Sequence, residues 1–427
     1  MLIGIFLFLK QIVDVIYELK VLDVLMVVFA LALIGVQSVR LLKDSGVNQS
    51  VQNVFALVKN QIKPIDYAVL ILACLYALSF LRDMHAMASF VKIESAFLIY
   101  VLGRVYGQKI IDKGRCLAIA SYLIVYANMI YIAAERWCDK YRCHMFPWDK
   151  FGMFNGGAMY YYKTDLAIGM ILASLFIYSY SKSKVFKWIT LYVAVPYTIY
   201  DANARLGKAI LACVLLSFLI REIVLRIKHR NVGKIMTADD DAKVSGKARK
   251  IGFLEIIFGI TAVFIVALFI AIQVTPVKQF KYYDLGLSSD LMNRLENLCH
   301  SRHIIWWDTF HSMANQGFFT RCIGIDLQNF PEYNDPHMMS HCLYLNMFFA
   351  IGYIGIFAFI AFLYLIFKNI GKLRDSNTRF VTVTLWLVIL IFGISMDPIE
   401  YTQISWFPFM YAGLIVNMIS SNVNNRE

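Results

Sequence analysis

The sequence is short of charged residues. Only 16% of its 427 residues are Asp, Glu, Lys or Arg, against about 25% in an average soluble domain. Hydrophobic residues make up 59% of the chain, more than a soluble core can hide behind a wettable surface. This balance excludes a disordered chain, a nucleic-acid binder and a small disulfide-stapled domain. It predicts an all-α polytopic membrane protein embedded in a lipid bilayer.

Several chemical signatures are also missing. The eight cysteines include no Cys-x-x-Cys pair and no zinc-ligand spacing. No carboxylate and histidine set in the loops has reliable metal-ligand spacing, so we expect no metal and no cofactor. His337 and His341 are four residues apart, a spacing that also suits a metal pair. No repeat of fixed period is present, so the inverted repeats of many transporters are not visible.

Apolar runs predict the membrane spans. A helix needs about 20 mostly apolar residues to cross a bilayer. Eleven clear runs meet this requirement, near 21–39, 66–82, 87–105, 116–134, 165–181, 185–200, 206–225, 252–274, 342–367, 380–396 and 404–420. Residues 2–17 carry Lys10 and Asp14 and are either a twelfth span or an interfacial helix. We expect about twelve spans.

The runs divide the chain into three parts in order. Residues 1–274 form a first helix bundle with a polar linker near 226–250. Residues 275–341 form one large loop, with about two short helices, before the last three spans. Residues 342–427 form a three-helix membrane segment.

Basic residues predict the orientation. Segment 221–250 holds nine Lys/Arg against four acids, and 104–115 and 368–379 are also basic. Counting spans puts all three on one side, which the positive-inside rule assigns to the cytoplasm. The large loop then lies outside. Cys138 and Cys143 also face out, towards an oxidising compartment, and are candidates for a disulfide.

Four arginines are candidate ligands for a phosphate group. Arg205 follows a very short outer turn and opens a span, where free N–H groups and the helix dipole favour an anion. Arg302 precedes an aromatic helical stretch in the large loop, with Arg294 upstream and Arg321 downstream. A guanidinium binds phosphate oxygens bidentately and keeps its charge. The alternatives are an interfacial anchor at Arg205 and structural ion pairs for the loop arginines.

A second group of polar residues surrounds the end of the large loop. His341 stands where the chain re-enters the membrane, and a neutral imidazole there can accept a proton near neutral pH. The alternative is that His341 merely caps the incoming helix, which Asn or Ser would do as well. Asp335 and His337 precede it in the same segment. Asp397 and Glu400 lie in another tight turn. They either complete a functional site or only solvate the turn.

This layout resembles the bacterial O-antigen ligases and O-antigen polymerases. The resemblance lies in many spans with one large outer loop before the last three, and in three short motifs. Arg205 opens a span after a short turn, and Arg302 precedes an aromatic helix. His341 ends the loop, and Gly352-Tyr353-Ile354-Gly355 follows in the next helix.

The resemblance implies a metal-independent, inverting glycosyltransferase of the bacterial inner membrane, with its active face outside. Its donor would be a glycan on undecaprenyl pyrophosphate, and its acceptor a glycan or lipid A-core. Arg205 and Arg302 would grip the pyrophosphate, and His341 would act as, or near, the base. A polymerase is favoured over a ligase because Cys342 replaces the Asn that usually follows the family's histidine. A chain-length regulator is a further candidate partner.

Two other functions remain open. A transporter or flippase of lipid-linked oligosaccharide predicts ionisable residues near the bilayer midplane and broken helices. A non-catalytic subunit of a polysaccharide assembly complex predicts that Arg205, Arg302 and His341 can each be lost without effect.

Overall fold

The computed structural model describes residues 1–14, 20–44, 62–141, 163–200, 205–235, 302–327, 340–373, 375–394 and 396–424. Across these ranges the regular structure is helical and contains no strand, which confirms the all-α prediction. The predicted span at 252–274 and most of the large loop lie outside the described residues.

The apolar helices are those of a membrane-embedded protein. By length and composition, five helices of the described ranges can cross a bilayer: Val21–Arg40, Pro64–Arg82, Met84–Tyr106, Gly114–Ala134 and Leu343–Ile370. Leu2–Val13, Asp165–Tyr180 and Ser376–Phe392 are shorter apolar helices. The predicted count of twelve is not confirmed. Helix α1 (Leu2–Val13) has 12 residues, about 18 Å, whereas a hydrocarbon core is about 30 Å thick.

The chain divides into two compact units, each described here by itself. Unit 1 comprises residues 1–124 and 275–427, and unit 2 comprises residues 125–274. This division follows contacts in space, whereas the three predicted parts follow the order of the chain.

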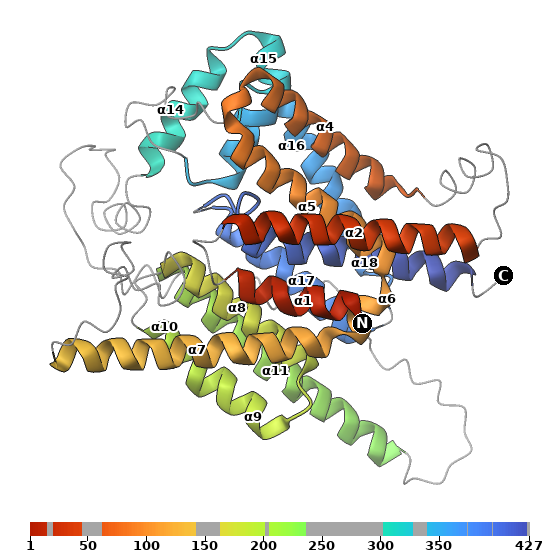
Figure 1. The fold of residues 1–427 in the computed structure, drawn as a ribbon, viewed down its shortest axis with the longest axis vertical. Helices are drawn as coiled ribbons and strands as arrows, with labels where there is room; N and C mark the ends of the chain where they lie inside the picture. The colour runs from red at the N-terminus through yellow and green to blue at the C-terminus, as the bar shows by residue number, and fades with distance from the viewer. Residues whose placement is uncertain are drawn as a thin grey trace. The chain divides into compact units, whose positions relative to one another are not determined.

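Unit 1 contains both ends of the chain (Figure 1). Its described helices are α1, α2 (Lys20–Asp44), α4 (Pro64–Arg82), η1 (Met84–Ala86), α5 (Met87–Tyr106), α6 (Gln108–Asp112), the first part of α7 (Gly114–Tyr141), α14 (Arg302–Ala314), α15 (Phe318–Ile323), α16 (Leu343–Ile370), α17 (Ser376–Phe392) and α18 (Thr402–Asn424).

Helices α5 and α18 make the most extensive contact in unit 1. A Cβ atom added to Gly103 of α5 would lie 2.0 Å from the carbonyl oxygen of Met410, and one added to Gly413 of α18 would lie 2.0 Å from that of Tyr100. Only glycine therefore permits this approach, as in other membrane helix pairs that use small residues. Asn417 adds a hydrogen bond from Nδ2 to the carbonyl oxygen of Arg104 at 2.7 Å.

Aromatic rings fill the core beside this pair. Phe409 of α18 lies 5.3 Å from Trp386 of α17 and 5.6 Å from Phe362 of α16, measured between ring centroids. Phe97 of α5 meets Phe409 edge-on at 5.5 Å. These rings are buried, and edge-to-face pairs of this kind stabilise a core beyond their buried area.

Helix α16 is broken at Gly352, whose φ of +62° and ψ of −161° are not helical. The turn after α15 packs into the break, because a Cβ atom on Gly352 would lie 2.5 Å from the carbonyl carbon of Cys322. Ile325 donates its N–H to the carbonyl oxygen of Phe349 at 2.7 Å. Helices α14 and α15 thus lie against the first half of α16 at one end of unit 1 (Figure 1).

Unit 2 is built around the contact of α8 (Lys163–Tyr180) with α11 (Arg205–Ile235). Between them in sequence, α9 (Lys184–Ile189) and α10 (Val195–Tyr200) are joined by the π-helical turn η4 (Thr190–Ala194). Tyr178 of α8 stacks on Phe218 of α11 with ring centroids 4.2 Å apart.

Candidate functional site

The structure places His341 immediately before helix α16, at the end of unit 1 where α14 and α15 pack. The N-cap residue of α16 is Cys342, with no side-chain capping bond, so His341 lies one residue before the cap. Its side chain is exposed, and its φ of +47° lies in the left-handed region. An exposed imidazole on a fixed backbone can accept a proton from a hydroxyl brought to it.

A chain of hydrogen bonds runs inward from the residues on either side of His341. Ser340 Oγ accepts from the Cys342 N–H at 3.1 Å and donates to Asn346 Oδ1. Asn346 Nδ2 donates to Asp397 Oδ2 at 2.9 Å. The other carboxylate oxygen of Asp397 accepts from the Ile399 N–H at 3.1 Å. The histidine segment is therefore tied to the turn between α17 and α18.

Acidic groups gather behind this chain. Asp397 is buried, with its carboxylate bonded to Asn346 and to the Ile399 N–H. Glu400 lies in the same turn, accepts a hydrogen bond from Ser89 of α5 and is near Lys92. Tyr76 of α4 lies within electrostatic range of Asp397, Glu400 and Glu94.

Burial dominates the electrostatics of this turn. It raises the pKa of Asp397, against the hydrogen bonds from Asn346 and from the Ile399 and Glu400 N–H groups. It also raises the pKa of Glu400, reinforced by the negative charge of Asp397 and opposed by Lys92 and Ser89. Both shifts have the sign expected for carboxyls taken out of water. The pair therefore holds protons at pH values where exposed carboxyls have lost them.

The aromatic helix of the large loop contacts the segment that contains His341. Helix α14 begins at Arg302, and its Trp306 donates from Nε1 to the Ser340 carbonyl oxygen at 3.1 Å. Ile305 and Met313 of α14 pack with Phe348 of α16 in a small apolar cluster. The predicted arginine-plus-aromatic motif and the predicted histidine thus belong to one end of unit 1.

Only part of the predicted arginine set can be located. Arg205 is the first residue of α11 in unit 2 and Arg302 the first of α14, and only their backbones lie within the description. Arg321 lies in α15, with a buried Nε atom that has no hydrogen-bond partner among the described residues. Arg294 lies outside the described residues. The predicted pyrophosphate ligands therefore stay a prediction.

The other predicted residues are accounted for as follows. Asp335, His337 and Cys143 lie outside the described residues, and Cys138 is described only as backbone within α7. The candidate disulfide stays a prediction. Among the described residues no group of three His, Cys, Asp or Glu side chains could hold a metal ion.

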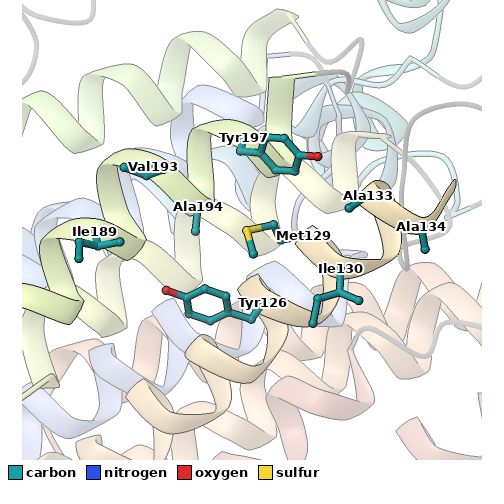
Figure 2. Close-up of a pocket in the computed structure, with 9 residues that line it drawn as sticks. All are labelled: Tyr126, Met129, Ile130, Ala133, Ala134, Ile189, Val193, Ala194 and Tyr197. Carbon is teal, nitrogen blue, oxygen red and sulfur yellow. The ribbon is translucent and has the colours of Figure 1, made fainter. Parts of the chain in front are cut away.

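Unit 2 contains a separate apolar pocket of about 730 Å³ (Figure 2). It lies between α7 and the segment from the end of α9 to α10, and all but two of its lining side chains are aliphatic or thioether. The hydroxyl of Tyr126 pairs with Thr190 Oγ1 at 2.9 Å, so one of those two is already satisfied. The pocket offers apolar surface and little chemistry.

Sequence reasoning missed the side chains that organise the site. Asn346 is the one amide or charged residue between Leu343 and Phe367. A single amide in an otherwise apolar span was the sequence signal that could have identified it. Arg82 closes α4, and its contact with the turn after α15 crosses 241 to 243 residues of sequence. No local pattern predicts such a contact.

Comparisons of the chain with protein-family models, with curated proteins and with solved structures found no match. The argument for function therefore depends on the residues and their geometry.

Proposed function

We propose that this membrane protein is a glycosyltransferase that moves a glycan from undecaprenyl pyrophosphate to a sugar hydroxyl during the assembly of a surface polysaccharide. One observation carries the proposal. His341 stands exposed, in a left-handed conformation, between residues bonded to Asn346 and to Trp306. The two short motifs of the resemblance that fall in unit 1 thus meet at one place.

The proposed reaction is a single displacement. The acceptor hydroxyl attacks the anomeric carbon of the donor sugar, and a new C–O glycosidic bond forms with inversion. The bond from that carbon to the pyrophosphate oxygen breaks, and the lipid pyrophosphate leaves with the electron pair. His341 takes the hydroxyl proton, a role typically worth about 10²- to 10⁴-fold in rate.

The leaving group needs fixed positive charge. Guanidinium groups at Arg205 and Arg302 would stabilise the charge that develops on the pyrophosphate, because they stay protonated throughout. Both residues begin helices, where unpaired N–H groups add to the attraction for an anion. Their assignment as pyrophosphate ligands comes from the resemblance, since only the backbone of each arginine is described. The polymerase remains the favoured member of the pair, with the ligase as its close alternative.

The decisive experiment compares His341→Asn and His341→Ala with the unmodified protein, purified in lipid nanodiscs and given a synthetic lipid-pyrophosphate donor. Asn tolerates the left-handed backbone as His does, so His341→Asn removes the base and keeps the conformation. We expect both variants to bind donor normally and to lose at least 100-fold in transfer rate. Near-normal transfer by His341→Asn would reject the proposal.

A second function, transport of lipid-linked oligosaccharide, is favoured by one observation. The break in α16 at Gly352 lies nine residues after Leu343, about 14 Å along the helix. Broken helices are typical of transporters. The same nanodisc preparation separates the two functions, since a transporter moves donor across the bilayer and forms no new glycosidic bond.

Localisation is part of the proposal. We assign the protein to the bacterial inner membrane, with the His341 end facing out and the basic segments at 221–250 and 368–379 facing the cytoplasm. A cysteine introduced within 283–290 should react with a membrane-impermeant maleimide in intact cells. Reaction only after permeabilisation would reverse the assigned orientation.

A further inference from the structure

His341 is the one residue other than glycine with a positive φ among the described residues. Residues other than glycine rarely adopt this backbone conformation, and when they do the surrounding structure must hold them in it. Neighbouring groups must therefore hold the backbone of His341 in this conformation.

The residues on either side of His341 are held from two directions. Ser340 is fully buried, and its carbonyl oxygen accepts from Trp306 at 3.1 Å. After it, the N–H of Leu343 donates to the carbonyl oxygens of Gly393 at 2.8 Å and Met396 at 3.2 Å. The main chain is thus fixed before and after the histidine.

Asn346, in the first turn of α16, links Ser340 to Asp397. Its Oδ1 accepts from Ser340 Oγ, and its Nδ2 donates to Asp397 Oδ2 at 2.9 Å. A carboxamide presents an acceptor and donors in one rigid plane, so it can bridge a hydroxyl donor and a carboxylate acceptor. Neither an alkyl side chain nor a carboxylate can make both bonds at neutral pH.

We propose that Asn346 is a positioning residue, which holds Ser340 against Asp397 and thereby keeps the His341 imidazole facing the acceptor hydroxyl. The inference rests on the proposed catalytic role of His341. The side chain of Asn346 is turned towards Ser340 and Asp397, away from the exposed His341 side chain. Misplacing a catalytic group by about 1 Å can cost about 10²-fold in rate, so the expected loss falls on turnover and leaves donor binding unchanged.

The first test is Asn346→Ala in the purified full-length protein, with synthetic lipid-pyrophosphate donor. Its matched control is Asn369→Ala, the same substitution in the same helix, at the far end of α16. We expect Asn346→Ala to lower the transfer rate 10- to 100-fold with an unchanged donor dissociation constant, and Asn369→Ala to behave as the unmodified protein. Ser340→Ala should show a similar loss, and the double variant should lose no more than either alone.

The second test measures how the transfer rate depends on pH, which a purely structural role of Asn346 would leave unchanged. In Asn346→Asp the introduced carboxylate faces Asp397, with Glu400 in the same turn and Tyr76, Glu94 and Lys92 on the helices packed against it. Two adjacent carboxyls hold together only while they share a proton, which they lose as pH rises. His341 needs the opposite condition, because an unperturbed imidazole is neutral only above about pH 6.5.

The rate of Asn346→Asp should therefore rise and then fall as pH increases, whereas the rate of the unmodified protein should rise to a plateau. Asn369→Asp should keep the plateau. A normal rate in Asn346→Ala, or a plateau of reduced height in Asn346→Asp, would overturn the positioning role. Transfer by His341→Ala at a normal rate would instead reject the proposed function, and the positioning role with it.

Discussion

Arg82 donates from Nη1 to the carbonyl oxygen of Gly324 at 2.6 Å, and so joins the end of α4 to the turn after α15. The same nitrogen lies 3.3 Å and 3.2 Å from the carbonyl oxygens of Ile323 and Ile325. These carbonyl oxygens lie at and just beyond the C-terminal end of α15, where the helix dipole favours a cation. The contact holds the turn in the break of α16.

Replacing Arg82 by Ala should loosen α15. A hydrogen bond to a charged group contributes about 1.5–3 kcal/mol, so local opening should become at least tenfold more frequent. Cys322, half-buried in α15, reports this opening as its rate of maleimide labelling, read by peptide mass spectrometry. Arg115→Ala, at an exposed arginine of α7, is the control. Equal labelling rates in both variants would show that Arg82 does not hold the turn.

Gly352→Ala should prevent normal folding of unit 1. Gly352 combines φ +62° with ψ −161°, a region open essentially to glycine alone, where a side chain costs about 3 kcal/mol. The added methyl would also meet the Cys322 carbonyl at 2.5 Å. Gly371→Ala, at the other end of the same helix, meets nothing closer than 3.4 Å. Thermal unfolding in detergent measures both; a melting temperature for Gly352→Ala within error of Gly371→Ala would contradict the observed break.

Gly413→Val should separate α5 from α18. The substituent would overlap the carbonyl oxygen of Tyr100, which a Cβ atom at Gly413 already approaches to 2.0 Å. Backbones that must move apart lose the van der Waals contact on which membrane helices depend. Gly35→Val in α2 is the control, since nothing lies within 4 Å of that position. We expect the yield of monodisperse protein on size exclusion to fall sharply for Gly413→Val only.

Stability should fall as pH rises because of Glu400. Its pKa is raised by burial and by Asp397, so the folded protein binds a proton that the unfolded chain releases near pH 4.3. The stabilisation is complete below that pH and is lost as pH rises through the higher folded pKa. Glu400→Gln should therefore melt at a higher temperature than the unmodified protein at pH 8 and show a flatter dependence on pH. Asp112→Asn, at an exposed acid, should change neither; parallel pH curves for Glu400→Gln and the unmodified protein would exclude this origin.

Much of the helix pattern was predictable because apolar runs are local. The runs at 66–82, 87–105 and 342–367 correspond to α4, α5 and α16 within a few residues. Hydropathy did not reveal that α16 is broken, because Gly352 only permits the break. The cause is a turn about thirty residues upstream that fills it.

The candidate site was predictable only where its residues lie at the ends of the apolar runs. His341 and Asp397 were visible as polar residues at span ends. Their connection through Asn346 was not, because it depends on α17 returning the chain to the start of α16. Left-handed backbone at a histidine has no sequence signature, since histidine adopts it only where tertiary contacts require it.

The contact of α5 with α18 has a consequence for how the protein is made. Arg104 and Asn417 are 313 residues apart, so the ribosome delivers α5 long before the helix against which it packs. All of unit 2 is synthesised in that interval. The glycine-lined face of α5 must therefore wait in the membrane, where another helix can occupy it. A nonsense mutation before residue 402 would leave that face without its partner, which makes the last helix the step that completes unit 1.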